Sequence, residues 1–392
     1  MKPRKITDGV HWLGAIDWDR RLFDSLIPLP DGTSYNAYLV EGSEKTVLID
    51  TVDPEFTDTL MAQLEGVKKL DYVISLHSEQ DHSGEIPTVL AKYPEARLIC
   101  SPKAKGFLID LLEIDEGRIT TVEDGETLSL GDRTLRFIHT PWVHWPETMV
   151  AFLEEDKILF SCDFFGSHIA ESELYAVDKA QVYKAAKRYF AEIMMPFRRT
   201  IEKNLDKLKP LDVEIIAPSH GSVYDEPGFI VDAYRQWVAG PLSNTVVLPY
   251  ISMHGSTQKM VDHLVEALIE RGVNVRQFEL VATDLGELAM SLVDATTIVI
   301  GTPTVLGGPH PKVAYATVLA NAIRPRVQFA SIIGSYNWGG KAVEILASMI
   351  PQLKVEILDP VLTKGVPLAD TKAALDKLAD DIAAKHKEKG VL

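Results

Sequence analysis

The first part of the chain alternates short apolar runs with turn residues. Residues 10–16, 35–40 and 46–50 are apolar, and the stretches between them, PDGTS and EGSEK, have the composition of turns. This pattern predicts a meander of β-strands. Residues 56–66 have the apolar spacing of a helix, and residues 71–76 (DYVISL) form a continuous apolar run that is typical of a buried strand.

Strand-like and helix-like segments continue to about residue 240. Strands separated by helices, with strand-rich stretches on both sides, predict two β-sheets packed between helices, an αββα sandwich. The strand-like segments are 96–100, 126–141, 148–155, 157–163 and 213–219, and the helix-like segments are 85–93, 102–112, 179–208 and 229–240.

A different pattern begins after GPLSN (residues 240–244). Five apolar strands now alternate regularly with helices, which predicts a doubly wound parallel five-stranded sheet of the α/β class. We therefore predict two domains, residues 1–243 and residues 244–392. The expected strands are 245–252, 274–280, 295–301, 328–334 and 354–360, with helices after Gln258 and near Pro311, Lys341 and Ala369.

Composition describes an ordinary globular protein and excludes several classes of partner. Of the 392 residues, 46% are hydrophobic and 24% are charged, and the net charge of −16 argues against nucleic acid and membrane surfaces. No apolar run is long enough for a transmembrane helix, and residues 1–10 lack the apolar core of a signal peptide. Two cysteines, Cys100 and Cys162, cannot build a disulfide framework or an iron–sulfur centre. We expect a cytoplasmic protein.

The motif HSEQDH (residues 77–82) concentrates metal-binding chemistry in one loop between the predicted strand 71–76 and the next helix. Alternate residues of an extended loop point the same way, so His77, Glu79 and Asp81 should converge on one point and His82 should face a second point. Leaving these groups buried without partners would cost roughly 1–3 kcal/mol each. A solvated polar loop is the alternative, and we favour a two-metal site.

Three further candidate ligands follow predicted strands. His144 lies after the strand that ends in TLRFI, Asp163 ends KILFSCD, and His220 ends VEIIAPSH. Strand ends from distant parts of a chain are how a rigid sheet presents a site. Together with the motif they supply four histidines and three carboxylates.

This order of residues resembles the metallo-β-lactamase superfamily over residues 1–240, whose motif usually reads His-x-His-x-Asp-His before later His, Asp and His ligands. Glu79 stands where those hydrolases have a histidine. That departure is the pattern of the flavodiiron proteins, and the resemblance extends into the second domain. It implies an oxo- or hydroxo-bridged diiron site in which His77, Glu79 and His144 hold one iron, Asp81, His82 and His220 hold the other, and Asp163 bridges them. Ligation by His82 stays open.

The other histidines and Phe197 also have expected roles. His139 is expected to pack or to support His144, and His168 either lines the pocket or has a structural role. Phe197 occupies a position where flavodiiron proteins often carry Tyr or Phe, and being Phe it cannot donate a proton. The remaining histidines, expected to be surface or packing residues, are His11, His263, His310 and His386.

Three loops of the second domain follow predicted strands, where a doubly wound sheet binds its ligand. The first, SMHGSTQKM, offers hydroxyls and a helix N-terminus suited to a phosphate, although a plain helix cap is the alternative reading. The second is TPTVLGG (residues 302–308), and in the third, GSYNWGGKA (residues 334–342), Tyr336 and Trp338 add flat aromatic surface for a ring. The set looks like flavodoxin and implies FMN. The candidate residues are Ser252, Met253, His254, Gly255, Ser256, Thr257, Thr302, Pro303, Thr304, Val305, Ser335, Tyr336, Asn337, Trp338, Gly339 and Gly340.

By this resemblance the protein is an oxidoreductase that reduces dioxygen to water, nitric oxide to nitrous oxide, or both. A separate donor such as rubredoxin or a reduced deazaflavin would supply electrons, and a head-to-tail homodimer or a dimer of dimers would bring one subunit's FMN to the other's irons. The rival hypotheses are a zinc hydrolase with an accessory flavodoxin domain and a redox sensor without turnover. The sequence does not separate dioxygen from nitric oxide as the substrate.

Overall fold

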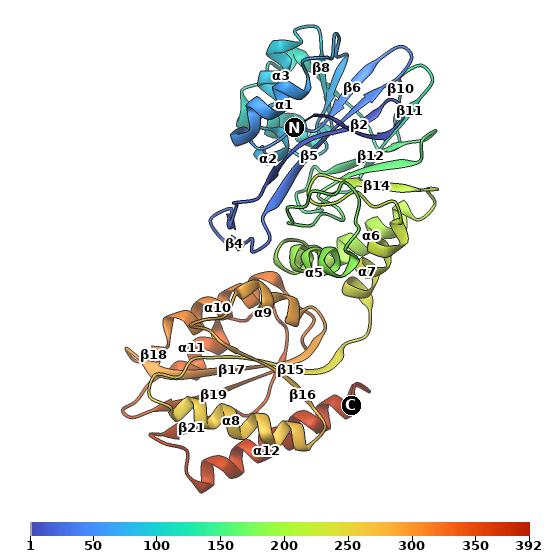
Figure 1. Ribbon diagram of the computed structural model, residues 1–392. Coiled ribbons are helices and arrows are strands. Elements are labelled where there is room, and N and C mark those ends of the chain that lie inside the picture. Colours follow the sequence, from blue (N-terminus) through green and yellow to red (C-terminus); the bar gives the residue numbers. More distant parts are fainter. Residues whose placement is uncertain (1) are drawn as a thin grey trace. The chain divides into compact units, whose positions relative to one another are not determined.

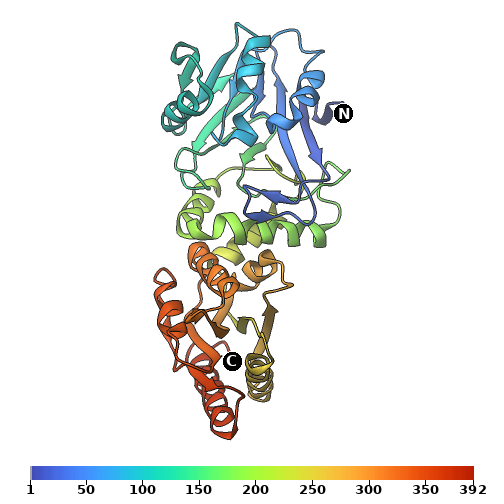
Figure 2. The ribbon, with the colours of Figure 1, turned by 90° about the vertical axis from the view of Figure 1, so that its left-hand side faces the viewer.

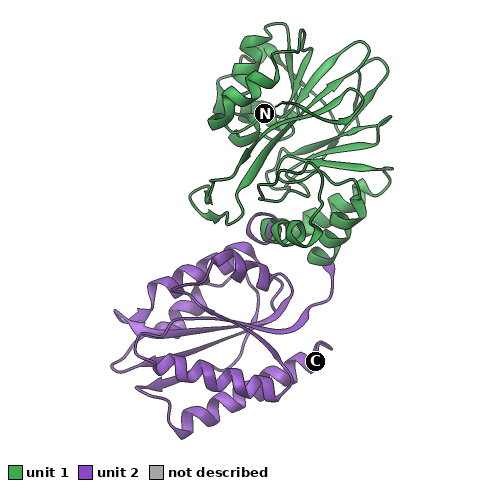
Figure 3. Ribbon diagram, viewed as in Figure 1, with its two compact units in different colours: residues 1–190, 197–238 green, residues 191–196, 239–392 purple. Residues whose placement is uncertain are grey.

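The computed structural model describes residues 2–392, which form two compact units (Figures 1 and 3). Unit 1 runs to residue 190 and includes residues 197–238. Unit 2 comprises residues 191–196 and 239–392. The domain boundary between residues 243 and 244 stays a prediction from the sequence.

Two β-sheets lie at the centre of unit 1. The first has the strand order β1-β2-β5-β6-β7-β8-β9, and the second has the order β10-β11-β12-β13-β14. The first sheet consists of β1 (Arg4–Thr7), β2 (Val10–Asp17), β5 (Thr33–Glu41), β6 (Thr46–Ile49), β7 (Tyr72–Ile74), β8 (Arg97–Cys100) and β9 (Ile119–Thr121). The second consists of β10 (Thr127–Ser129), β11 (Thr134–His139), β12 (Met149–Leu153), β13 (Ile158–Cys162) and β14 (Ile215–Pro218). A short hairpin, β3 (Leu22–Phe23) and β4 (Ile27–Pro28), follows β2.

The inner strands of the first sheet are buried on both faces, and their alternating side chains enter two different cores. In β6, Leu48 packs into the core between this sheet and its helices, whereas Val47 and Ile49 enter the core between the two sheets. Phe137 and Phe160 of the second sheet face the same inter-sheet core. This arrangement is the predicted αββα sandwich.

Helices cover the outer faces of both sheets of unit 1. The blue and cyan helices α1 and α3 lie outside the first sheet, and the green helices α5, α6 and α7 lie beyond the second (Figures 1 and 2). The helices are η1 (Pro54–Phe56), α1 (Thr57–Gln63), α2 (Gln80–Ser83), α3 (Ile86–Lys92), α4 (Pro102–Leu112), η2 (Glu116–Arg118), α5 (Lys179–Tyr189), α6 (Arg198–Leu208) and α7 (Pro227–Ala239).

The prediction of a single helix over residues 179–208 is wrong. The α-helical hydrogen bonding stops after Tyr189, a π-helical turn covers Phe190–Met194, and a 3-10 turn covers Met195–Phe197 before α6 begins. Pro196 has no N–H to donate and its ring clashes with the preceding turn, so an uninterrupted α-helix cannot pass through it.

Unit 2 is the predicted doubly wound parallel sheet, with the strand order β16-β15-β17-β19-β20. Alternation again sends side chains to two cores: Val246 and Leu248 face α8 and α12, and Val247 faces α9 and α10. The strands are β15 (Ser243–Tyr250), β16 (Asn274–Glu279), β17 (Ala295–Val305), β18 (Gly308–Pro309), β19 (Phe329–Tyr336), β20 (Glu356–Ile357) and β21 (Val361–Lys364). The helices are α8 (Ser256–Glu270), α9 (Leu285–Leu292), α10 (Pro311–Ile323), α11 (Ala342–Ser348) and α12 (Ala369–Glu388).

Two details of unit 2 differ from the prediction. The fifth strand is split, because β20 and β21 each pair in parallel with β19. Helix α9 was missed, although Asp284 is a recognisable N-cap whose side chain accepts the Gly286 N–H. His386, which was expected to lie at the surface or to pack, has a packing role: it is buried, and its ring bonds Thr297 and Asn244, which fixes α12 to the sheet.

Candidate metal centre and ligand pocket

The seven candidate metal ligands lie together at one end of the two sheets of unit 1. His77 follows β7, Asp163 follows β13 and His220 follows β14, while His144 comes from the loop between β11 and β12. Glu79 immediately precedes α2, and this helical turn contains the remaining two candidates, Asp81 and His82. Distant parts of the sequence meet here because the strands end at the same edge.

The HSEQDH segment does not have the extended geometry that the sequence suggested. Residues 80–83 form the helical turn α2, so alternate side chains no longer point the same way. The expectation that Asp81 converges with His77 and Glu79 is therefore wrong. Two groups form instead: a first triad of His77, Glu79 and His144, and a second triad of Asp81, His82 and His220, with Asp163 beside both. This is the grouping that the family resemblance implies.

Asp163 faces the two triads with different oxygens. Its Oδ2 lies 3.4 Å from His77 Nε2 and 3.3 Å from His144 Nε2. Its Oδ1 lies 3.1 Å from His82 Nε2 and 3.6 Å from His220 Nε2. A carboxylate placed in this way can bridge two cations.

Each triad also gathers its own carboxylate. In the first, Glu79 Oε2 lies 3.1 Å from both His77 Nε2 and His144 Nε2. In the second, Asp81 Oδ2 lies 3.1 Å from His220 Nε2. Nitrogen and oxygen donors thus point at two neighbouring positions.

Several of these buried atoms have no hydrogen-bond partner within residues 2–392. They include both carboxylate oxygens of Asp81 and of Asp163 and both ring nitrogens of His82. Such groups would cost roughly 1–3 kcal/mol each if nothing filled the space between them. The donor set therefore fits a pair of metal ions, with one nitrogen- and oxygen-lined position in each triad.

Two of the histidines are held in place by hydrogen bonds from their other ring nitrogen. His77 Nδ1 lies 2.8 Å from Glu147 Oε1, which also accepts the Ser78 N–H at 3.1 Å. His220 Nδ1 lies 2.7 Å from the Ser34 carbonyl. Both bonds leave Nε2 free to face the candidate metal positions.

The charges of the metal-free site are strongly coupled. Burial alone would lower the pKa of His77, but hydrogen bonds with Glu147 and Glu79 outweigh it and raise the pKa to about 10. In the same way, Asp163 and Glu79 raise the pKa of His144 to about 10, against the effect of burial. Burial also opposes the rise for His82, whose pKa reaches about 9 because of Asp81 and Asp163.

The remaining candidates have distinct positions. His168 Nδ1 lies 2.9 Å from Thr33 Oγ1, and its ring lies 4.7 Å from that of His220, so it lines the second triad. Burial lowers the pKa of His168 well below its usual value and keeps it neutral. His139 Nε2 bonds the carbonyl of Val122, the residue after β9, and has a packing role.

Sequence reasoning missed Tyr189. Its buried ring lies 4.9 Å from that of His168 and 6.0 Å from that of His220. The sequence pattern predicts Tyr189 only as one residue of a long helix, and no local signal marks it as part of the site. Phe197 stacks on Trp142 at 5.8 Å and lines a cavity of about 520 Å³ beside His144.

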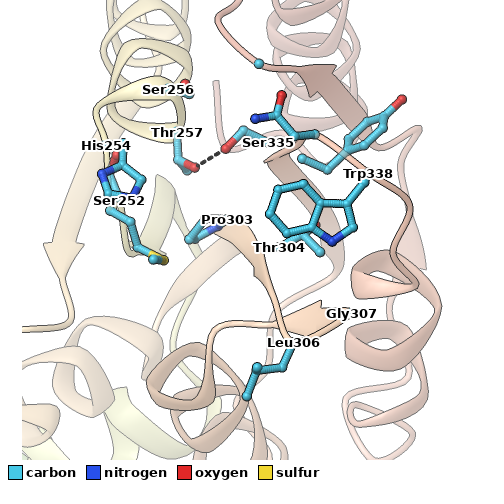
Figure 4. A pocket seen from close by; sticks show the side chains of 14 residues that line it. Ser252, His254, Ser256, Thr257, Pro303, Thr304, Leu306, Gly307, Ser335 and Trp338 are labelled. Carbon is cyan, nitrogen blue, oxygen red and sulfur yellow. Dashed lines mark hydrogen bonds between the residues drawn. The ribbon is translucent and has the colours of Figure 1, made fainter.

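Unit 2 contains a cavity of about 400 Å³ where β15, β17 and β19 end (Figure 4). Figure 4 shows Ser252, His254 and Thr257 on one side and Trp338 on the other, with a 3.0 Å hydrogen bond between Thr257 Oγ1 and Ser335 Oγ. The predicted residues that line it are Ser252, Met253, His254, Ser256, Thr257, Pro303, Thr304, Ser335, Tyr336, Asn337 and Trp338.

Some predicted residues of this pocket do not line it. Thr302 turns its hydroxyl to the Pro303 carbonyl and the His310 N–H, and Gly255 sets the turn into α8 with a φ of 84°. Residues that sequence reasoning missed complete the wall. Predicted residues outside the lining are Thr302, Val305, Gly255, Gly339 and Gly340, and the additional lining residues are Leu306, Gly307 and Gly365.

Comparison with known proteins places the chain in a family. Residues 33–221 match the model of the ODP family of β-lactamases. The chain is 35% identical to a nitric oxide reductase of Moorella thermoacetica, over 98% of this chain and 99% of that protein. It is 33% identical to the rubredoxin-oxygen oxidoreductase of Megalodesulfovibrio gigas, over 99% of each.

Solved structures agree over the whole length. The rubredoxin oxygen:oxidoreductase of Desulfovibrio gigas superposes with a TM-score of 0.95 at 32% identity and covers 100% of both chains. The flavodiiron protein of Giardia intestinalis superposes with a TM-score of 0.93 at 26% identity, over 99% of this chain and 98% of that one. The chain belongs to the flavodiiron protein family.

This membership confirms the predicted fold class: a metallo-β-lactamase-like sandwich followed by a flavodoxin-like sheet. In this flavodiiron protein the triads lie in the first unit and the 400 Å³ pocket lies in the second. Among residues 2–392, none of the helices has the length and apolar character needed to span a membrane.

The raised histidine pKa values predict that metal binding releases protons. A metal takes the neutral imidazole, whereas His77, His82 and His144 are protonated at pH 7 in the metal-free protein. Raising the pH toward 9–10 removes these protons, so the apparent affinity for ferrous iron should rise with pH. Anaerobic calorimetry at pH 7 in buffers of different ionisation enthalpy should count up to three protons released. An affinity for iron that stays flat from pH 6 to 8.5, with no proton release, would contradict this prediction. Asp163→Ala, which removes a candidate ligand, is the comparison variant and should bind iron more weakly.

Proposed function

We propose that this flavodiiron protein reduces dioxygen to water, nitric oxide to nitrous oxide, or both, at a diiron site supplied with electrons by FMN. The observation that carries the proposal is the position of Asp163, whose two oxygens face two separate triads. The proposed division of labour gives residues 1–243 the irons and residues 244–392 the flavin.

Iron is the favoured metal because of the donor set. Glu79 adds a hard anionic ligand to the first triad, which favours ions such as iron and stabilises their oxidised form. Zinc has no accessible second oxidation state and could not use electrons. Relatives carry names that fit redox work: a nitric oxide reductase, a rubredoxin-oxygen oxidoreductase and a coenzyme F420H(2) oxidase.

The pocket of unit 2 supports FMN as the flavin. Its phosphate would lie at Ser252, Ser256 and Thr257, where α8 begins and its first N–H groups are available. The ring would lie between the loop at Pro303 and Thr304 and the loop at Tyr336 to Trp338, where flat side chains surround the cavity.

The reaction needs electrons and protons in equal number: four of each for dioxygen to two waters, two of each for two nitric oxide molecules to nitrous oxide and water. The irons and FMN, when bound, supply the electrons. The protein's part is to hold the ligand atoms in place through Glu147 and Ser34, and to keep the second triad enclosed by the rings of His168 and Tyr189.

An external donor and a second subunit complete the proposal. The donor is a separate rubredoxin or a reduced deazaflavin, consistent with the names of two relatives. A head-to-tail homodimer, or a dimer of such dimers, would place the FMN of one subunit beside the irons of the other.

Metal analysis and stopped-flow kinetics test the proposed function. The aerobically purified protein should hold about two irons and one FMN per chain, and the reduced form should be reoxidised rapidly by dioxygen, nitric oxide or both, in repeated turnovers. Zinc together with ester or lactam hydrolysis would support a hydrolase, and a flavin that never turns over would support a sensor. Either result would contradict the proposal.

Glu79→His and Asp163→Ala should each lower gas reduction about 100-fold while FMN stays bound, because the first replaces a hard carboxylate donor by an imidazole and the second removes the carboxylate that both triads share. Turnover with dithionite-reduced enzyme and the flavin absorbance of the same samples check both statements. Glu41→His is the matched control, since it makes the same replacement at an exposed glutamate outside the triads. Full gas turnover in either ligand variant would refute the site.

Gly255→Trp should lose FMN and keep its irons. Gly255 has a φ of 84° at the start of α8, where a bulky residue strains the phosphate loop and fills the space beside it. Flavin absorbance and iron content of the purified variant are the measurements. Gly390→Trp, at another positive-φ glycine of unit 2 with open space around it, is the control for strain alone. Normal flavin content in Gly255→Trp would count against the phosphate loop.

Electron transfer between subunits can be tested by complementation. A heterodimer that joins one Glu79→His chain to one Gly255→Trp chain contains one intact flavin site and one intact metal site, on different subunits. If the pairing is head-to-tail, two differently tagged chains purified together should recover activity that neither homodimer has. A heterodimer as inactive as its parents would show that the two cofactors must lie in one chain.

A further inference from the structure

The two candidate metal positions have matched direct donors. Each triad supplies two imidazoles and one carboxylate, and Asp163 offers one oxygen to each. The direct donors at the two candidate metal positions therefore have the same total charge. Any difference in their electron affinity has to come from the groups behind the ligands.

The groups hydrogen-bonded to the triad imidazoles differ in charge; the buried carboxylate of Asp50 accepts from the Leu76 N–H and the Ser219 hydroxyl instead. Behind the first triad, the buried carboxylate of Glu147 accepts from His77 Nδ1 at 2.8 Å, and neither side chain is exposed to solvent. Behind the second triad, His220 Nδ1 donates to the neutral carbonyl of Ser34 at 2.7 Å. The ring of His82 has no hydrogen-bond partner within residues 2–392.

A full negative charge behind an imidazole makes that imidazole a stronger electron donor. Hydrogen bonds to an ionised acceptor are roughly twice as strong as those to a neutral one, and a carboxylate behind a ligating histidine raises its basicity. The effect is large at this site because both partners are buried, where charges are screened poorly.

We propose that Glu147 is a positioning residue that makes the first triad the more electron-rich position, so that the first electron given to the oxidised pair settles in the second triad. The inference rests on the proposed diiron function. With the irons bound, one electron from reduced FMN would convert a diferric pair to one ferric and one ferrous ion. Asp81, His82 and His220 would hold the ferrous ion, and a second electron would reduce the ion held by His77.

The wild-type protein provides a direct test. Crystals of the iron-loaded, FMN-containing protein are reduced anaerobically with dithionite to the one-electron state of the iron pair, monitored by electron paramagnetic resonance. Spatially resolved anomalous scattering at the iron edge then assigns an oxidation state to each position. We expect ferrous iron in the second triad. Ferrous iron in the first triad, or an even distribution, would overturn the proposal.

Glu147→Gln tests the role of the charge. Both hydrogen bonds go to Oε1 of Glu147, so the amide oxygen of glutamine can accept the same two bonds without the negative charge. The first triad should then become easier to reduce. In a redox titration followed by paramagnetic resonance, the constant for forming the mixed-valence state should fall about tenfold, which corresponds to 59 mV for one-electron couples.

The controls separate charge from structure. Glu41→Gln removes an equal charge beside a histidine, His11, at an exposed site and should leave the constant unchanged. Glu147→Asp keeps the charge and should restore part of the wild-type value. An unchanged constant in an iron-loaded Glu147→Gln variant would refute the role of the charge; if that variant holds no iron, the wild-type crystals decide.

Failure of this inference differs from failure of the proposed function. A wild-type protein without two irons would end both. Two irons with gas turnover, but with the electron first in the first triad, would end the inference and leave the function intact.

Discussion

The bridging position of one carboxylate determines the rest of the first unit's site. Asp163 is 1% exposed and turns one oxygen toward each triad, so the two candidate metal positions can be neighbours only while it stays in place. It follows directly after β13, whose parallel partner β14 leads to His220. The sheet therefore fixes the spacing between Asp163 and His220.

The remaining ligands depend on loops that are tied to one another. The loop with His144 also contains Glu147, whose carboxylate accepts from His77 and from the Ser78 N–H. Its backbone carbonyl accepts from Ser101 at the start of α4. A change in one ligand-bearing loop is thus transmitted to the next through buried hydrogen bonds, which is how loop residues can keep the precision of a rigid scaffold.

Much of the architecture could be predicted from hydrophobic periodicity, because strands such as β6 divide Leu48 and Val47 between two cores. The helical turn α2 was missed because a polar four-residue turn has no apolar periodicity to reveal it. The break at Pro196 could have been predicted, because a proline within a helical pattern argues against an uninterrupted helix over residues 179–208.

Side chains brought together by tertiary structure were the hardest to predict. Tyr189 packs its ring beside His168 and His220, and no pattern in the neighbouring sequence marks this contact. Leu306, Gly307 and Gly365 line the second unit's pocket from loops whose residue types have no special chemistry. The candidate metal ligands could be singled out from the sequence because their residue types have few other uses at strand ends.

The pocket of the second unit has a consequence for how its contents are retained. The described residues that line it include no aspartate, glutamate, lysine or arginine. An anionic group bound there would be held by hydroxyls and backbone N–H dipoles, which act at short range and depend on orientation. Dissolved ions weaken attraction between separated charges over about 10 Å at 0.1 M, but they interfere little with direct hydrogen bonds in a partly enclosed loop. Retention of the cofactor should therefore follow the folding of three loops rather than the ionic strength of the surrounding solution.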